Sequence, residues 1–322
     1  MQASRRSILG LITLLISGCA ARFAAPKPLA DAPRPDGEFT MDDGESLPYR
    51  LWAPETPSAA MLALHGFTDS RDAFEYSGDA FTDAGIAVYA PDQRGFGAAP
   101  RRGYWAGADR MVRDAVACFA AVRALHPGLP VYLIGESMGG AVAVLAAPGC
   151  KPDAIGLLAP AIWSRRRMSP AYRGGLWFAR HIIPSYRATG RDVPHPVRAS
   201  DNNEALIRLG EDPLTLKAVR LDMMVGLAEL MDRAAQVATR FDAPCLWQYG
   251  AHDELVSPAA TLDDWQRIVG VRQAYYIHGW HLLLRDHGRA VPTADLLGFL
   301  RDPGAPLTSG AEIAAAAWRA GS

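Results

Sequence analysis

The chain has 322 residues, of which 49% are hydrophobic and 21% are charged, so it is long enough for one large core with an insertion. Its 33 basic and 34 acidic residues leave a formal net charge of -1 at pH 7. This balance is typical of an ordinary globular protein and lacks the excess of positive charge that nucleic-acid binding requires.

The first nineteen residues carry an export pattern. A short basic stretch, 1–6, precedes a mostly apolar run, 7–17, that is too short to span a membrane. Ile16-Ser17-Gly18-Cys19 resembles a bacterial lipobox, which implies that 1–18 is a signal peptide and that Cys19 becomes the lipidated first residue. We therefore expect a lipid-anchored protein of the bacterial cell envelope, at the outer membrane or the periplasmic face of a membrane.

Other interpretations of the export segment stay open. Ser4-Arg5-Arg6-Ser7 also resembles a twin-arginine signal, and the segment would serve as an uncleaved anchor or as a plain secretion signal. Residues 19–37 are rich in Ala and Pro without hydrophobic periodicity, which predicts a tether between the anchor and the folded domain.

Three further cysteines, Cys118, Cys150 and Cys245, lie in or beside apolar segments. This placement predicts buried free thiols rather than a disulfide framework. A bridge between Cys118 and Cys150 stays open in an oxidising compartment.

From residue 38 onward, short apolar runs alternate with longer helical patterns. The first two runs flank Asp42–Glu45, which predicts a hairpin. Near-continuous apolar strands separated by helices predict an α/β fold with a mostly parallel sheet covered on both faces. The predicted strands are 38–41, 47–52, 60–64, 86–90, 131–135, 154–158, 244–249 and 273–277, and the predicted helices lie near 71–84, 107–125, 138–147, 258–269 and 289–300.

One interval breaks this alternation. No strand pattern occurs in 161–240, where helices and turns predict a cap inserted after the sixth strand. Its first half, 161–200, holds eight arginines against one acid, Asp192, with aromatic residues between them. This pattern favours contact with a membrane surface or an anionic substrate, although charges on a cap are more often only solvated. The predicted parts are the signal peptide 1–18, the tether 19–37, the core 38–160 and 241–302, the cap 161–240, and an Ala-rich C-terminal tail 303–322.

The stretch Gly135-Glu136-Ser137-Met138-Gly139-Gly140 follows the predicted strand 131–135 and opens a predicted helix. Gly-x-Ser-x-Gly between a strand and a helix is typical of a nucleophile elbow, in which a tight turn presents the serine hydroxyl at the end of the sheet. Alone, the five-residue pattern is weak, because a serine between glycines is also an ordinary turn. The flanking strand and helix favour Ser137 as a nucleophile.

A serine nucleophile needs a base and an orienting acid. Asp253 and His281 each follow a later strand, and the order Ser137, Asp253, His281 suits a sheet whose reactive groups gather at the carboxyl ends of its strands. Glu254 is a rival acid, while Asp242 precedes its strand and would lie at the wrong edge. Histidines 278, 252 and 287 are interpreted as structural, surface or supporting groups, and their spacing favours no metal site.

The oxyanion of an acyl-transfer reaction needs two hydrogen-bond donors. The backbone amide of Met138, directly after the nucleophile, is the first candidate. The second is the amide of Phe67 in His65-Gly66-Phe67, because this loop follows the strand 60–64. His65-Gly66 would otherwise be read as a simple turn.

These motifs, together with Asp92–Gly97 and Gly279-Trp280-His281, resemble the α/β-hydrolase superfamily over about 38–300. Within it they are most similar to the monoacylglycerol lipase and lysophospholipase group, which includes serine aminopeptidases of the S33 type. The resemblance implies ester hydrolysis through an acyl-enzyme, beneath a helical lid. Two positions depart from the group, which often has His where Glu136 stands and Ser where Ala98 stands.

The sequence thus predicts a serine carboxylic ester hydrolase acting on an acyl ester or lipid, with no cofactor and no nucleic-acid partner. Peptidases and acyltransferases use the same triad, and the sequence does not separate them from an esterase. A non-catalytic lipoprotein that kept the fold as a binding module is the alternative of another class.

Overall fold

The computed structural model describes residues 32–165, 168–192, 197–237 and 241–321. At its centre lies an eight-stranded sheet in the order β1-β2-β4-β3-β5-β6-β9-β10. β2 is antiparallel to β1 and β4, and every pairing from β4 onward is parallel, so the predicted α/β fold is confirmed. The strands are β1 (Gly37–Thr40), β2 (Ser46–Trp52), β3 (Ala59–Leu64), β4 (Ile86–Pro91), β5 (Val131–Glu136), β6 (Ile155–Leu158), β9 (Cys245–Gly250) and β10 (Val271–Tyr276).

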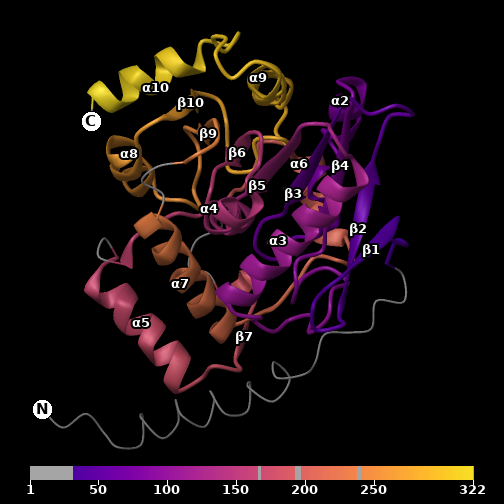
Figure 1. Ribbon diagram of the computed structural model, residues 1–322. Helices are drawn as coiled ribbons and strands as arrows, with labels where there is room; N and C mark the ends of the chain where they lie inside the picture. The colour runs from indigo at the N-terminus through magenta and orange to yellow at the C-terminus, as the bar shows by residue number, and fades with distance from the viewer. Residues whose placement is uncertain (1–31, 166–167, 193–196, 238–240, 322) are drawn as a thin grey trace, which may run out of the picture.

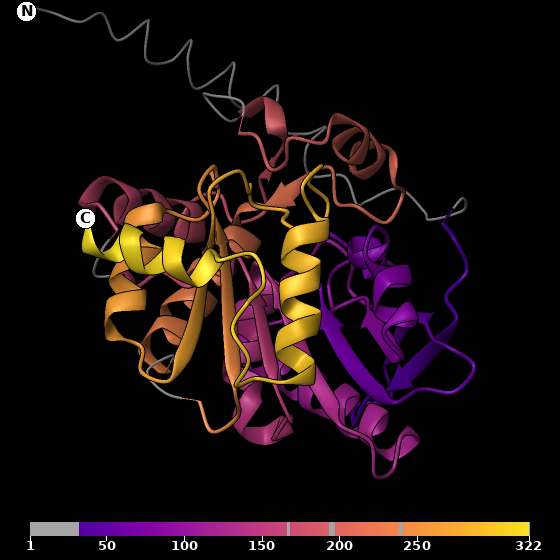
Figure 2. The ribbon, with the colours of Figure 1, turned by 90° about the horizontal axis from the view of Figure 1, so that it is seen from above.

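Helices cover both faces of this sheet (Figures 1 and 2). The strand β5 shows why: Val131 and Leu133 enter one hydrophobic core, while Tyr132 and Ile134 enter another on the opposite face. The helices α3, α4, α7 and α8 contribute to the first core, and α2 and α9 to the second. The helices are η2 (Arg71–Phe74), α2 (Gly78–Asp83), α3 (Ala108–Leu125), α4 (Met138–Cys150), α5 (Pro170–His181), η4 (Gly190–Asp192), α6 (Asn203–Glu211), α7 (Leu221–Val237), α8 (Pro258–Arg267), α9 (Ala290–Arg301) and α10 (Ala311–Ala320).

The C-terminal helix α10 covers the edge strand β10. The ring of Trp318 stacks on Tyr275 with a centroid distance of 4.4 Å and on Tyr249 at 5.6 Å, while Ala311 and Ala315 are buried. An uncovered edge strand invites pairing with other chains, so this helix protects the sheet. The Ala-rich composition of 303–322 had suggested only a tail.

The cap contains α5, α6 and α7, and a small antiparallel ladder of β7 (Arg187–Ala188) with β8 (Val219–Arg220). Strands of two residues are too short to show a period, so the sequence pattern missed this ladder. Backbone hydrogen bonds tie the cap to loops at the carboxyl ends of the core strands, from Leu216 to Thr68 and from Leu282 to Ala199. The cap therefore lies at the end of the sheet where the candidate site residues were expected.

The predictions for cysteines and membrane segments have different outcomes. Cys118, Cys150 and Cys245 are free thiols and buried, as predicted. Throughout the described ranges, the structure has no helix that is both long enough and apolar enough to cross a membrane. The predicted signal peptide 1–18 and the predicted lipidation site Cys19 lie outside the described residues.

Candidate active site

The turn from β5 into α4 places Ser137 in an uncommon backbone conformation, with φ 53° and ψ -116°. A non-glycine residue with positive φ is strained, and such strain persists only where the surroundings hold it. Here the Ser137 N–H donates to the Leu158 carbonyl (2.9 Å), and the Ser137 carbonyl accepts from the Ala161 N–H (2.8 Å). The neighbours Glu136 and Met138 are buried, whereas Ser137 is only partly buried.

The glycines of the elbow are required by close backbone packing. A Cβ at Gly135 would lie 2.3 Å from the Gly139 carbonyl oxygen, and a Cβ at Gly139 would lie 2.1 Å from the Leu64 carbonyl oxygen. Neither backbone oxygen can move without shifting α4 or β3. The Gly-x-Ser-x-Gly pattern is therefore a packing requirement of this turn.

Asp253 and His281 meet on the loops that follow β9 and β10. His281 Nδ1 lies 2.8 Å from Asp253 Oδ2, and both side chains are buried. The other Asp253 oxygen accepts from the backbone N–H groups of Leu255 (2.8 Å) and Val256 (2.9 Å). Because the carboxylate accepts at Nδ1, this hydrogen-bond network assigns the proton to Nδ1 and leaves Nε2 of the neutral ring as the base.

The surroundings of His281 act on its pKa in opposite directions. Burial lowers the pKa, but the charge and hydrogen bond of Asp253, with the charges of Glu136 and Asp286, together outweigh burial and raise it above 6.5. Since only the neutral imidazole is a base, the base form is lost as the pH falls through this raised pKa. Ser137 Oγ makes no hydrogen bond within the described part of the chain, and catalytic contacts of this kind often tighten only when substrate is bound.

The loop after β3 is held by the buried ring of His65. Nδ1 lies 2.8 Å from the Gly66 carbonyl oxygen, and Nε2 accepts from the Gln93 N–H at 3.0 Å. One nitrogen donates and the other accepts, so the ring is neutral. Burial lowers the pKa of His65, which also favours the neutral ring. Fixing the Gly66 carbonyl orients the Gly66–Phe67 peptide, so that the Phe67 N–H points away from His65.

The two candidate oxyanion donors are both available. Neither the Phe67 N–H nor the Met138 N–H has an acceptor among the described residues. A Cβ at Gly66 would lie 3.4 Å from the Ser137 Cβ, so the two loops are in contact. Sequence reasoning named the loop but missed the roles of His65 and Gln93, for which only the position of His65 after a strand gave a signal.

A buried ion pair joins the loops after β3 and β4. Arg71 Nη1 donates to Asp92 Oδ2 (2.5 Å), and Asp92 also accepts from the backbone N–H groups of Arg71 (2.7 Å) and Ala98 (2.8 Å). A Cβ at Gly97, where φ is 52°, would lie 2.0 Å from the Asp92 carboxylate. The motif Asp92–Gly97 therefore supports the site without contributing a reacting group.

The rival site residues lie elsewhere. Glu254 is exposed and accepts from the backbone N–H of Arg198 (2.7 Å), and His252 stacks on Trp280 at 5.2 Å. His278, which was interpreted as a structural histidine, is exposed two residues after the end of β10. Among the described residues, no group of three or more side chains is placed to hold a metal ion.

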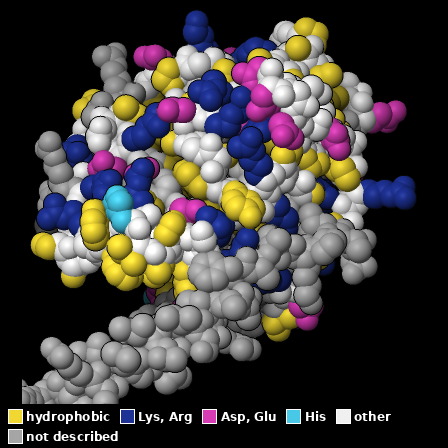
Figure 3. Space-filling model, turned by 90° about the horizontal axis from the view of Figure 1, so that it is seen from below, with side chains coloured by type: hydrophobic (Ala, Val, Ile, Leu, Met, Phe, Trp, Pro, Cys, Tyr) yellow, Lys and Arg dark blue, Asp and Glu magenta, His cyan; other side chains and the backbone are white. Residues whose placement is uncertain are grey.

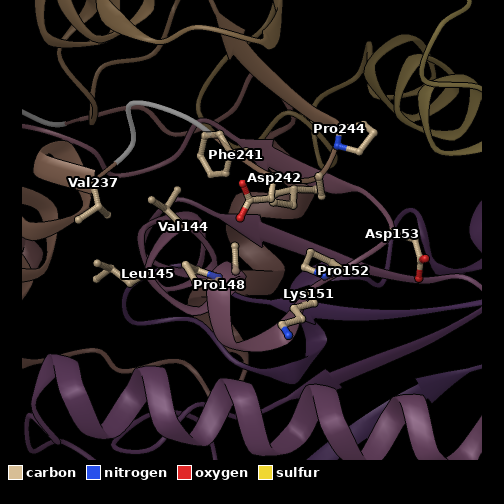
Figure 4. Close-up of a pocket in the computed structure, with 13 residues that line it drawn as sticks. Val144, Leu145, Pro148, Lys151, Pro152, Asp153, Val237, Phe241, Asp242 and Pro244 are labelled. Carbon is tan, nitrogen blue, oxygen red and sulfur yellow. The ribbon is translucent and has the colours of Figure 1, made fainter.

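Asp242 precedes β9 and lies at the amino ends of the strands, opposite to the candidate site, as expected. With Phe241 and Pro244 it lines a cavity of about 610 Å³ between the end of α4 and the start of β9 (Figure 4). This cavity lies at the amino ends of β6 and β9, whereas Ser137 follows the carboxyl end of β5. It is therefore separate from the candidate site.

A protein-family model described as serine aminopeptidase, S33, matches residues 55–288. The chain belongs to this family. The match runs from just before β3 to beyond His281, and it therefore contains Ser137, Asp253 and both candidate oxyanion donors. The chain is thus an α/β hydrolase of the monoacylglycerol lipase-like group.

Relatives of this S33 hydrolase include named lipases. The chain is 25% identical over 242 residues to a monoacylglycerol lipase of Mycolicibacterium smegmatis, which covers 72% of this chain and 84% of that protein. It is 25% identical over 219 residues to human monoglyceride lipase, covering 66% and 71%. These likenesses support hydrolase activity of the lipase or esterase kind.

Solved structures share the fold. A monoacylglycerol lipase of Paleococcus ferrophilus superposes with a TM-score of 0.66 at 19% identity, over 79% of this chain and 98% of that chain. A soluble variant of monoglyceride lipase from Saccharomyces cerevisiae gives 0.68 at 16% identity, over 86% and 98%.

The elbow packing predicts that Gly139→Ala destabilises the protein. Its Cβ would meet the Leu64 carbonyl, and such overpacking costs about 3 kcal/mol of the free energy of unfolding. Gly298→Ala on α9 is the control, because nothing lies within 4 Å of its Cβ and alanine is the better helix former, by about 0.5–1 kcal/mol. Urea unfolding measures both, and equal stabilities of the two variants would contradict the packing argument.

Proposed function

We propose that this chain is a serine carboxylic ester hydrolase that cleaves a monoacylglycerol or a lysophospholipid through an acyl-enzyme. The observation that carries the proposal is the arrangement of side chains and backbone amides at the carboxyl ends of the sheet strands. A strained Ser137 lies beside two backbone amides that have no acceptor in the described part of the chain. It lies at the carboxyl ends of the strands, as does the buried His281 that Asp253 orients.

Each group has a role in the proposed reaction. His281 Nε2 takes the proton of Ser137 as Oγ forms a bond to the ester carbonyl carbon. The N–H groups of Phe67 and Met138 bind the oxyanion, and the imidazolium then gives its proton to the departing alcohol as the C–O bond breaks. Water, deprotonated by His281, attacks the acyl-enzyme and releases the fatty acid and Ser137.

Two observations favour a lipid ester. The named relatives are monoacylglycerol and monoglyceride lipases. The helix α5 buries Leu176 against α7, while its outer side exposes Tyr172, Trp177 and Phe178, with Ile182 directly after it. Large aromatic side chains of this kind suit the boundary between water and lipid.

Charge on the cap is less uniform than the sequence suggested. Arg187 is buried, and Arg180 forms an ion pair with Glu229, so neither is a free surface charge. Arg173 is exposed beside the aromatic residues. On the left of Figure 3, where α5 lies, yellow hydrophobic side chains gather next to dark blue basic ones. Arg166 and Arg167 lie outside the described residues.

We also propose that lipidated Cys19 holds the enzyme in the bacterial cell envelope, with 19–37 as the tether. The order of basic, apolar and small residues before Cys19 supports this. A tethered enzyme would meet its substrate at the membrane surface, where the exposed side of α5 would contact lipid.

Ser137→Ala is expected to abolish ester hydrolysis, to below about a thousandth of the wild-type rate, because no other hydroxyl occupies the elbow. Labelling by a fluorophosphonate probe is expected to vanish with it. Ser58→Ala, an exposed serine before β3 at the other edge of the sheet, is the control and should keep both. Activity that survives in Ser137→Ala would show that the nucleophile is another residue. Assaying wild type on peptide amides as well as esters tests the peptidase alternative.

Mass spectrometry of the mature protein is expected to find a lipid-modified N-terminus at Cys19. Cys19→Ser is expected to release the protein from the membrane fraction. An unmodified chain that begins at another residue would contradict the anchor, while leaving the hydrolase proposal standing.

Trp177→Ala combined with Phe178→Ala is expected to weaken binding to anionic lipid vesicles about tenfold or more, because two aromatic side chains no longer enter the interface. The test uses protein lacking residues 1–21, so that the anchor does not mask the effect, and sedimentation with vesicles as the measurement. Ile313→Ala, 77% exposed on α10, is the control. Activity on a short soluble ester should stay unchanged, and equal losses of vesicle binding and of this activity would point to a folding role.

A further inference from the structure

Glu136, the last residue of β5 and the neighbour of Ser137, is a buried carboxyl group without a hydrogen-bond partner. Its side chain is 1% exposed, and neither carboxyl oxygen has a partner among the described residues. By the alternation of β5, it shares a side of the sheet with Tyr132 and Ile134, whose core α2 and α9 cover. Polar groups buried in this way are rare and call for an explanation.

Charged and titratable groups on two loops interact electrostatically with Glu136. The loop before η2 supplies Asp69, and the loop after β10 supplies His281, Arg285 and Asp286. Arg285 is already engaged, because it donates to the Asp69 carboxylate (2.5 Å) and to the Ala73 carbonyl (2.9 Å). The groups that act on Glu136 are therefore one guanidinium that is already hydrogen-bonded elsewhere, two carboxylates and the imidazole of the candidate base.

Asp286 and the carboxylate that binds His281 also have hydrogen-bond partners of their own. Asp286 accepts from Ser200 Oγ (2.6 Å) and from the backbone N–H of Trp280 (2.7 Å), beside His281. Asp253 makes its own bonds to His281 and the backbone. Of the groups that act on Glu136, His281 is the one whose charge changes during the proposed reaction.

Burial, together with the charges of Asp69 and Asp286, raises the pKa of Glu136 to about 7, and the charges of Arg285 and His281 offset only part of this effect. The carboxyl group is therefore protonated in mildly acidic solution and ionised in mildly alkaline solution. Its negative charge favours the protonated form of His281.

We propose that Glu136 is a positioning residue that acts through His281: in addition to Asp253, it supplies negative charge that stabilises the imidazolium formed when Ser137 gives up its proton. This inference rests on the proposed function of the Ser137–His281 pair. The strength of the base is then set by two carboxylates, of which Glu136 ionises within the working pH range.

The test is the pH profile of kcat/KM for Glu136→Gln, measured on a short soluble ester with the full chain. Glutamine keeps the shape and imitates the protonated acid, so the acidic limb is expected to move to lower pH by about 0.5–1 unit. The variant is expected to be several-fold slower than wild type near pH 9 and closer to it near pH 6. A merely structural role would lower activity equally at every pH. Glu136→Met, which leaves no polar atom in the buried space, is the second variant and should behave alike.

The free energy of unfolding, measured as a function of pH, is a second test that does not depend on enzyme activity. The pKa of Glu136 is higher in the native state than in the unfolded chain, so protonation of Glu136 stabilises the native state. This stabilisation is complete below about pH 4.5 and is lost as the pH rises through about 7. Glu136→Gln should therefore gain stability relative to wild type at pH 8 but not at pH 5. Glu204→Gln, exposed on α6, is the control for net charge and should show neither effect.

The outcomes separate the inference from the function on which it rests. An active wild type and an inactive Ser137→Ala, with an unmoved acidic limb in Glu136→Gln, would overturn the role of Glu136 alone. Activity in Ser137→Ala would overturn the proposed nucleophile, and the inference with it. A shifted limb together with a pH-dependent gain in stability would support the inference.

Discussion

The structure of the site depends on the lack of space where β5 enters α4. The strand, the helix and the neighbouring strand β3 meet through backbone atoms, and Gly135 and Gly139 leave room for no side chain there. The chain must therefore turn within one residue, and Ser137 takes the positive φ that results. The strain is held by hydrogen bonds to Leu158 and Ala161, so the start of the cap is fixed to the same residue that presents the hydroxyl.

Buried ionic and polar contacts keep the surrounding loops in place. Arg71 with Asp92 joins the loops after β3 and β4, and Arg285 with Asp69 joins the loop after β10 to the one before η2. A buried pair contributes little net stability, because the loss of hydration offsets the attraction, but losing one partner leaves an uncompensated charge. Such contacts therefore specify the positions of loops more than they stabilise the fold. Glu136 differs from these paired carboxylates, because neither of its oxygens has a hydrogen-bond partner among the described residues.

Arginines that are close together in the sequence of the cap lie in different environments in the folded protein. The cap arginines looked like one basic patch, yet Arg187 is buried and Arg180 is paired, while Arg198 bonds to the Ser200 and Asp201 carbonyls and lies 5.1 Å from the centroid of the Trp280 ring. The exposed aromatic side chains of α5 are the more distinctive feature, since leaving Trp177 60% exposed loses apolar burial unless another surface covers it.

The sequence by itself determined the sheet and the identity of the candidate residues. Apolar strands such as 131–135 have a strong local period, and the glycines around Ser137 reflect a turn that only small residues permit. The two-residue ladder β7–β8 and the packing of α10 through Trp318 were decided by the tertiary structure, because neither has a local period. The same holds for the environment of each group. Residues far away in the chain decide that His65 is neutral, that Asp253 rather than Glu254 meets His281, and that Glu136 is buried with no partner among the described residues. The reason is that burial and charge are properties of the folded neighbourhood.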